Sequence, residues 1–310
     1  MKEKKKQTNY FSKHNVGTQL RVLYIVAIII PIVLIGSIVY IFSYQKLTEN
    51  YEHLTAMKAR QIQSVLMTTT LYMENVYDKV TQDEELQELL ASQYEDTYHV
   101  QHALMGYNGF TQILRNTASL TGLQLYVNED FLKQEKEINY FTPITDSVKA
   151  TDWYRQASAT RGNFWKSSLR VGKYGVLYWE LNYYCRIPIP KTSSYAILVL
   201  TVSNDHLRSL IQRDEYDVYI SVNSDPVFFS SDRSYSGNSL PVDLSDVSVR
   251  LATGERTINS EHTIAATTAL VPYNTDDQIN ILVTARDAMY YIHRLALVFI
   301  LILCFTLAIS

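Results

Sequence analysis

The feature that most constrains this chain is a run of 24 residues, 22–45, without a charged side chain. A helix that rises about 1.5 Å per residue needs about 20 apolar residues to cross a hydrocarbon core of about 30 Å. Pro31 and Gly36 lie inside the run, and both residue types are tolerated in membrane helices. A signal peptide would have a shorter apolar region and a small-residue cleavage site. We therefore expect residues 22–43 to form a retained transmembrane helix.

A second apolar run closes the chain. Arg294 is followed by 16 uncharged residues that end at Ser310. This is a few residues fewer than a complete span requires. We expect residues 291–310 to form a second, truncated transmembrane helix; the alternative is a short hydrophobic tail that does not cross.

The charge distribution predicts the orientation of the chain in a membrane. Residues 1–21 carry six Lys or Arg side chains and one acidic side chain, which is typical of a cytoplasmic tail. Residues 44–290 are then extracellular. Residues 44–293 carry 30 acidic and 21 basic side chains, and this acidic balance argues against contact with nucleic acid. We expect a bacterial cell-membrane protein, because its external part has one cysteine, Cys185, and so no internal disulfide.

The first part of the external region, residues 44–121, is predicted to be a helical stalk. Neither Gly nor Pro occurs between Tyr44 and Met105, which permits a nearly continuous helical N-terminal half. We expect one helix over 44–80 and two shorter pieces over 83–93 and 97–120. Between Tyr44 and Val80, side chains at steps of three and four residues share one stripe, which Lys58 and Gln61 interrupt. The stripe consists of Leu47, Tyr51, Leu54, Ile62, Val65, Thr69, Tyr72, Val76 and Val80. Such a stripe packs either on a domain or on the same helix of a second protomer.

From Gly122 the pattern changes to short alternating segments, which predicts an α+β fold. A Thr-Asp pair at 151–152 is expected to cap a short helix, and a second helix follows Asp205. Residues 231–254 read as a loop. The expected strands are 123–127, 163–168, 178–187, 195–202, 217–222, 227–230, 262–272 and 279–285.

This layout resembles the double Cache sensor regions of bacterial sensor histidine kinases. The resemblance rests on the segment TDWYRQA (151–157) with the later Trp165, on the strands CRIPI and YAILVLTV with the helix that follows them, and on the hairpin DVYISVNSDPVFFSS. It implies two PAS-like antiparallel sheets, one in a membrane-distal module (122–213) and one in a membrane-proximal module (214–290). It also implies a cytoplasmic output domain that receives the signal. The apolar stripe of the 44–80 helix favours a homodimer formed through this helix.

The first membrane segment is similar to those of sensor kinases that work with AraC-type response regulators. This likeness implies a histidine kinase module beyond Ser310 and a cognate response regulator. The alternatives are the sensor region of a methyl-accepting chemoreceptor, a membrane-bound AraC-type regulator, and an envelope interaction protein that senses no small molecule.

The sequence departs from the resembled family at one position. Members that bind amino acids carry an Arg two residues before the Trp-Tyr pair, where this chain has Thr151. A bidentate clamp on a ligand carboxylate would therefore lack its guanidinium. Arg155 is close in sequence, but on a helix it points elsewhere. The departure argues against an amino acid as the ligand.

Aromatic side chains provide the candidate binding site. The chain has 24 Tyr but 10 Phe, and Tyr and Trp combine a flat apolar ring with a polar tip. Such rings suit the flat faces of sugars, so a saccharide is a candidate among small extracellular ligands. The candidate binding residues are Trp153, Tyr154, Trp165, Tyr126, Tyr178, Glu180 and Asn182. The alternative is that these rings only fill the core and surface of an aromatic-rich sheet.

No catalytic motif is present in these 310 residues. There is no phosphate-binding loop, nucleophile elbow, phosphoacceptor histidine box or ATP lid. We expect no catalytic residue, metal or cofactor in this segment, and whether the whole protein is an enzyme stays open. His99 and His102 are separated by two residues, yet no third ligand is near them in sequence, so we interpret them as surface side chains.

Overall fold

The computed structural model of the chain describes residues 16–134, 136–160, 162–171, 177–211, 216–223, 225–229, 256–260, 263–285 and 288–309. The chain forms two compact units. One contains the chain up to His53 and from Asp287 onward, and the other contains Leu54–Arg286. The predicted loop over 231–254 lies outside the described residues.

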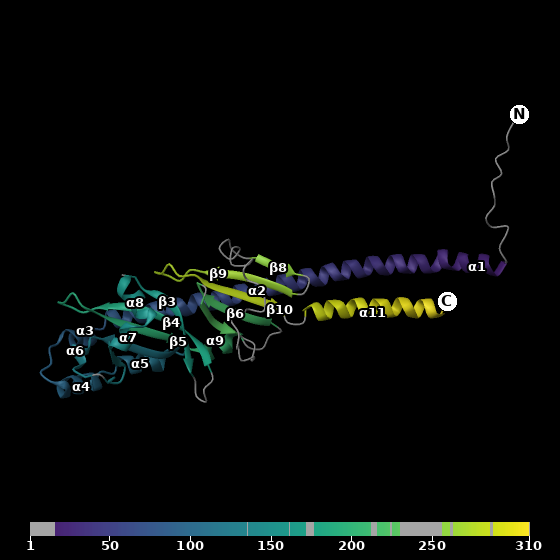
Figure 1. Cartoon of the computed structure of the whole chain (residues 1–310). Coiled ribbons are helices and arrows are strands. Elements are labelled where there is room, and N and C mark those ends of the chain that lie inside the picture. The colour runs from purple at the N-terminus through teal and green to yellow at the C-terminus, as the bar shows by residue number, and fades with distance from the viewer. Residues whose placement is uncertain are drawn as a thin grey trace. The chain divides into compact units, whose positions relative to one another are not determined.

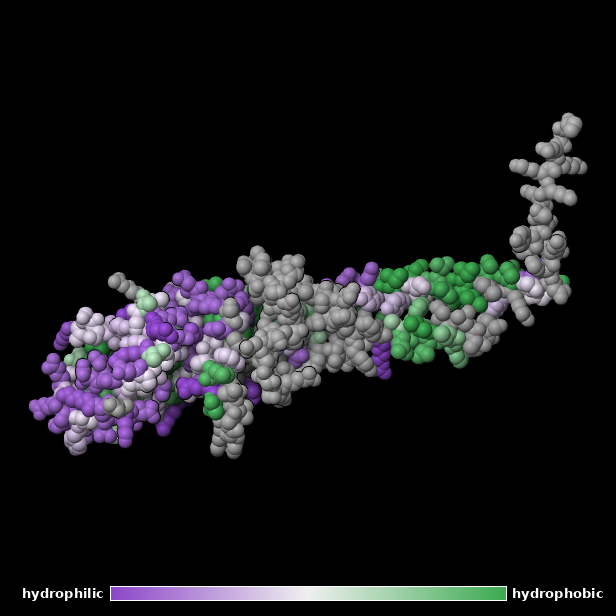
Figure 2. Space-filling view, viewed as in Figure 1, coloured by the Kyte–Doolittle hydropathy of each residue, from purple (hydrophilic) through white to green (hydrophobic). Residues whose placement is uncertain are grey.

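The described residues of the first unit form helices (Figure 1). The segments α1 (Val16–Tyr24), a π-helical turn (Ile25–Ile29) and α2 (Ile30–Thr81) follow one another without a break. Among the described helices, this one alone is long and apolar enough to cross a membrane. Figure 2 shows hydrophobic residues gathered along it. Side chains such as Ile35 and Phe42 on this helix are exposed. The predicted second span corresponds to α11 (Ala288–Ile309), and its passage through a membrane stays a prediction.

The helix predicted over 44–80 is confirmed, but the predicted stripe is partly wrong. Leu54 and Tyr72 are exposed, whereas Lys58, expected to interrupt the stripe, is buried. The buried side chains are Thr55, Lys58, Ala59, Ile62, Leu66, Thr69, Thr70, Met73, Glu74, Val76 and Val80. Apolar residues occur on two faces of this helix, and packing selects the face that Ala59, Leu66 and Met73 share.

The shorter helical pieces expected over 83–93 and 97–120 are present after Thr81, but the second piece is divided into two helices and ends before residue 120. Three shorter helices follow: α3 (Glu84–Ala91), α4 (Thr97–Gly106) and α5 (Gly109–Asn116). Asp83 accepts the Leu86 N–H at 3.0 Å and thereby starts α3. An Asp that caps a helix satisfies a free amide of the first turn, so it favours a new helix over continuation of the previous one.

The first sheet has the order β2-β1-β5-β4-β3 and is antiparallel except for the β1–β2 pair. Its strands are β1 (Leu120–Val127), β2 (Phe141–Pro143), β3 (Phe164–Val171), β4 (Leu177–Pro188) and β5 (Tyr195–Val202). The predicted strands in this region are confirmed, and β2 was not predicted. Helices α6 (Glu129–Leu132), α7 (Asp146–Lys149) and α8 (Asp152–Ala159) lie between β1 and β3 in the chain.

The second sheet has the order β7-β6-β10-β9-β8, and helix α9 (Asn204–Ile211) precedes it in the chain. Its strands are β6 (Tyr216–Val222), β7 (Asp225–Phe229), β8 (Arg256–Ser260), β9 (Thr263–Leu270) and β10 (Ile279–Ala285). Strand β8 was not predicted. All strand pairings in the second sheet are antiparallel. The fold is therefore α+β with a long N-terminal helix, as the sequence predicts.

The two faces of the first sheet have different surroundings. Alternate residues such as Leu125 and Leu198 join one large core with Leu66 and Met73 of α2 and Phe110 of α5. Successive side chains of a strand point to opposite faces, so their neighbours in sequence lie on the other side of the sheet. That second face packs against α8 and carries the candidate site.

Candidate functional site

Helix α8 begins at a local capping motif. The hydroxyl of Thr151 accepts the Tyr154 N–H at 3.4 Å and donates to the Val148 carbonyl at 2.6 Å. Thr151 thus has a structural role at the position where the resembled amino-acid binders carry Arg. Arg155 forms an ion pair with Asp152 on the same helix and is exposed, so it points elsewhere, as predicted.

The start of α8 brings its rings onto the first sheet. The ring of Trp153 stacks on Tyr184 with centroids 5.2 Å apart, and Tyr184 stacks on Phe164 at 5.0 Å. Tyr126 lies tilted against Trp153 at 4.9 Å. Phe164 and Tyr184 are directly paired across β3 and β4, which places both rings on one face. We call the side of the sheet that carries Tyr126, Phe164 and Tyr184 the ring face.

The rings differ in exposure. Phe164 and Tyr184 are buried, whereas Tyr126, Trp153 and Tyr154 keep part of their surface in solvent. The stacked pair therefore forms a base, and the other three rings offer apolar surface to a ligand. Planar rings held by stacking lose little conformational entropy when they bind a flat molecule.

A chain of polar side chains crosses the ring face beside the aromatic rings. Thr201 donates its hydroxyl to the Asn182 amide oxygen at 2.7 Å, and the Asn182 amide nitrogen donates to Ser168 at 2.7 Å. Asn182 is buried, and both ends of its amide have protein partners. A buried amide with both ends bonded has a fixed orientation, so this chain of contacts holds β3, β4 and β5 in register.

One ion pair lies on the same face. Arg170 Nε lies 3.0 Å from Glu180 Oε2, and the Glu180 side chain is 14% exposed against 55% for Arg170. The pair joins β3 to β4, where Arg170 sits directly opposite Tyr178 in the register. Solvent at the Arg170 end screens the pair and leaves that guanidinium accessible. Arg170 was not predicted as a site residue.

The phenols of Tyr126 and Tyr184 on the ring face stay neutral. Burial raises the pKa of Tyr184, and the nearby Tyr126 raises it further, while Arg170 opposes both. Burial also raises the pKa of Tyr126, again against the effect of Arg170. The Tyr126 hydroxyl donates to Gln124 Oε1 at 3.1 Å. The face therefore presents hydroxyl groups rather than phenolate charges around neutral pH.

The structure brings together five of the seven predicted site residues: Tyr126, Trp153, Tyr154, Glu180 and Asn182. Trp165 lies on the opposite face, where it is buried and stacks on Tyr183 with centroids 4.6 Å apart. Tyr178 belongs to β4, and its side chain is outside the described part of the structure. Phe164, Tyr184 and Arg170 were missing from the predicted set. Alternation with Glu180 and Asn182 could have added Tyr184, whereas Phe164 and Arg170 required the β3–β4 register.

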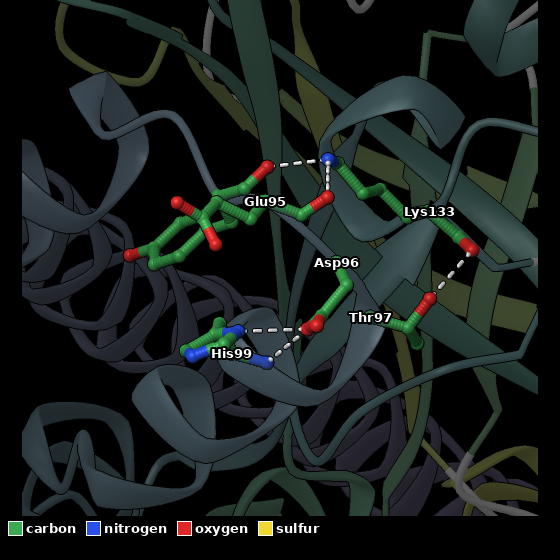
Figure 3. A network of polar contacts seen from close by, with 6 residues as sticks. Glu95, Asp96, Thr97, His99 and Lys133 are labelled. Carbon is green, nitrogen blue, oxygen red and sulfur yellow. Dashed lines mark hydrogen bonds and ion pairs between the residues drawn. The ribbon is translucent and has the colours of Figure 1, made fainter.

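His99 of α4 lies in a separate polar network (Figure 3). His102 contacts the ring of Tyr98 on the same helix. Asp96 accepts the His99 backbone N–H at 2.9 Å, and the His99 ring nitrogen Nδ1 lies 2.8 Å from the same oxygen. These contacts with His99 lower the pKa of Asp96. Lys133 donates to the Glu95 carbonyl at 2.9 Å and so closes the loop before the helix. Within the described residues, no group of three His, Cys, Asp or Glu side chains is placed to hold a metal.

No protein-family model and no curated protein sequence matches this chain. Its fold does match solved structures. The periplasmic sensory domain of the Campylobacter jejuni chemoreceptor Tlp1 has a TM-score of 0.58 at 13% identity, over 80% of this chain and 98% of that one. Methyl-accepting chemotaxis protein X gives 0.54 at 12% identity, over 77% of this chain and 98% of that one.

The extracellular domain of a protein assigned as a histidine kinase gives a TM-score of 0.53 at 12% identity. The match covers 78% of this chain and 96% of that domain. At such low identity the likeness concerns the fold alone. The chain thus has the fold of the extracellular and periplasmic sensory domains found in histidine kinases and chemoreceptors.

Proposed function

We propose that this chain is the sensing part of a bacterial membrane receptor that binds a small polar molecule at the ring face. The observation that carries the proposal is the set of part-exposed rings of Tyr126, Trp153 and Tyr154 beside the Glu180–Arg170 pair. A few fixed polar groups around apolar rings are typical of small-ligand sites. The sensory-domain fold supports the same function.

The proposed chain organisation follows the two sheets. Residues 1–21 are a cytoplasmic tail, 22–43 and 291–310 are transmembrane helices, and 44–121 are the extracellular helical stalk. Residues 122–213 form the membrane-distal module, and 214–290 form the membrane-proximal module. The strands β1–β5 and β6–β10, which form separate sheets, support this division, although β1 begins two residues earlier, at Leu120.

A saccharide is the ligand class that we favour. The apolar C–H face of a sugar can lie on the exposed parts of Trp153 or Tyr126, and its hydroxyls can bond to Gln124 or Glu180. Arg170 supports a second candidate, a small carboxylate, because a guanidinium binds a carboxylate through two N–H groups. Thr151 is occupied as a helix cap, which argues against amino-acid capture through that position.

The proposed output is a cytoplasmic histidine kinase with an AraC-type response regulator. Chemoreceptor output and a membrane-bound AraC-type regulator are the alternatives, and the fold occurs with both kinase and chemoreceptor proteins. A ligand moves a two-state equilibrium only through its different affinities for the two states. A change from 1:99 to 99:1 needs about 5.5 kcal/mol of that difference, and a micromolar ligand supplies about 8 kcal/mol in total.

A second copy of the chain is the proposed partner of the outward face of α2. This face exposes Leu54, Met57, Met67, Leu71 and Tyr72, each at least 40% accessible. Met67→Cys should form a disulfide-linked dimer under mild oxidation in membranes. Tyr98→Cys, at an exposed position of α4, is the matched control and should remain monomeric. Equal cross-linking at both positions would reject this dimer surface.

A thermal-shift screen of the 310-residue chain in detergent tests the ligand site. Sugars, amino acids and small carboxylates form the library, and a ligand at 100 times its dissociation constant should add about 2.7 kcal/mol of stability. Trp153→Ala should abolish the shift, while Tyr98→Ala should preserve it. Arg170→Gln should remove the response to carboxylates and leave the response to sugars. If no compound shifts the melting temperature, a non-sensing envelope protein becomes the better interpretation.

A further inference from the structure

The turn between β9 and β10, residues 271–278, contacts the buried side of α2. The Asn274 amide nitrogen donates to Glu74 Oε1 at 2.7 Å. Glu74 is a carboxylate on α2 with only 5% of its surface exposed. A buried carboxylate is costly unless both its oxygens have donors, so its partners are held in place.

The second oxygen of Glu74 bonds to the ring-bearing sheet. Glu74 Oε2 accepts the hydroxyl of Tyr183, which belongs to β4. Burial and the adjacent Glu74 carboxylate both raise the pKa of Tyr183, so this hydroxyl keeps its proton and stays a donor. Tyr183 directly precedes Tyr184, the base of the ring stack. One carboxylate of α2 therefore holds both the strand below the ring face and the β9–β10 turn.

The same turn also contacts the first sheet directly. Asp277 Oδ2 accepts the backbone N–H of Trp165 in β3 at 2.6 Å, and Asp277 Oδ1 accepts the Asn223 amide at 3.0 Å. Trp165 follows Phe164 of the ring stack. Asp277 lies two residues before the start of β10 at Ile279. A displacement of β3 therefore acts directly on the residue that leads into β10.

We propose that residues 271–278 form a clasp that couples the ring-bearing strands β3 and β4 to helix α2 and to strand β10. The clasp holds Glu74 through Asn274 and holds the Trp165 amide through Asp277. Helix α2 contains most of the first apolar segment, and β10 precedes α11 in the chain. One turn is thus hydrogen-bonded to α2, which carries the first proposed span, and leads into β10, which precedes the second proposed span. This coupling is a property of the protein itself and does not depend on which ligand binds.

Hydrogen exchange of the 310-residue chain in detergent, followed by mass spectrometry, tests the clasp without a ligand. The variant Trp153→Ala serves as the perturbation, because it removes the ring that stacks on Tyr184. With the clasp intact, it should accelerate exchange in β3–β4 and also over 271–285. The expected acceleration over 271–285 is about fivefold or more, the lower end of typical coupling between sites.

The clasp is broken by Asn274→Gly combined with Asp277→Ala. Asn274 has φ of 58°, a conformation that Gly adopts readily, so the first change removes the amide without straining the turn. In this background, Trp153→Ala should accelerate exchange in β3–β4 alone. Asn139→Gly is the matched control, because Asn139 has φ of 53° in another turn and is exposed. The control should leave the response over 271–285 intact.

Two results would overturn the proposal. One is a response over 271–285 that persists in the broken-clasp background; the other is a Trp153→Ala effect confined to β3–β4 in the intact chain. If the double variant does not fold, Tyr183→Phe serves as the alternative, because it removes only the hydroxyl that bonds to Glu74. This change should reduce the acceleration of hydrogen exchange that Trp153→Ala causes in the α2 peptides that contain Glu74. An unchanged α2 response in Tyr183→Phe would equally reject the clasp. Failure of the ligand screen would leave these measurements unaffected.

Discussion

The ring of Trp153 lies on the ring of Tyr184, with centroids 5.2 Å apart and planes inclined by 24°. This contact joins helix α8 to strand β4, two elements separated in the chain by β3. It also defines the ring face, because Tyr184 in turn stacks on Phe164. The position of Trp153 depends on the start of α8, which the Thr151 cap fixes.

Trp153→Ala should destabilise the protein because it removes apolar contact with Tyr126 and Tyr184. For a partly exposed Trp we expect a loss of about 2–4 kcal/mol, which corresponds to a fall in Tm of about 5–10 °C. Thermal unfolding followed by circular dichroism measures it. Trp153→Phe should keep more than half of the stability, and a Tm equal to that of Tyr98→Ala would show that the stack contributes nothing.

Thr151→Ala should cost about 1 kcal/mol, because the Tyr154 N–H loses its side-chain acceptor at the first turn of α8. Thr151→Ser keeps a hydroxyl at the same place and should be close to wild type. Urea unfolding at neutral pH compares the two variants. A similar loss in both would indicate that packing of the Thr methyl group, and not the cap, is responsible.

Stability should fall at alkaline pH, in part because of Tyr184. Its folded-state pKa lies above the ordinary value of 10.0, so the folded protein holds this proton more tightly than the unfolded chain. The contribution is complete below about pH 10 and is lost as the pH rises further, with a slope of up to about 1.4 kcal/mol per pH unit. Tyr184→Phe should make the decline above pH 10 shallower.

Urea unfolding at several pH values between about 9 and 12 measures that slope. Tyr98→Phe, at an exposed position, is the control and should reproduce the wild-type slope. If Tyr184→Phe declines as steeply as wild type, the Tyr184 phenol has the same pKa in the folded and unfolded states.

Gly36→Leu should disturb the pairing of α2 with α11 inside the first unit. A Cβ atom at residue 36 would lie 2.7 Å from the Phe299 ring, which itself stacks on Tyr40 at 5.4 Å. Hydrogen exchange in α11 should therefore increase. Phe299→Ala in the Gly36→Leu background should restore part of the protection by making room, whereas a further increase would show that no steric conflict exists at residue 36.

Local signals in the sequence were sufficient for several elements. The Thr151–Asp152 cap predicted the start of α8, and the continuous apolar run in 195–202 predicted β5, because both depend on residues adjacent in the chain. The charge-free run likewise predicted the apolar N-terminal helix from length and composition alone. Strand β2, with three residues, and β8 carried too little pattern to be predicted.

The sequence by itself determined the α+β class, the long helix and the aromatic character of the candidate site. The tertiary structure decided which apolar face of α2 is buried and on which side of the sheet each ring lies. Trp165 and Phe164 are neighbours in sequence, yet only Phe164 reaches the ring face. Side chains alternate along a strand, so strand pairing decides this assignment, and pairing depends on residues far apart in the chain.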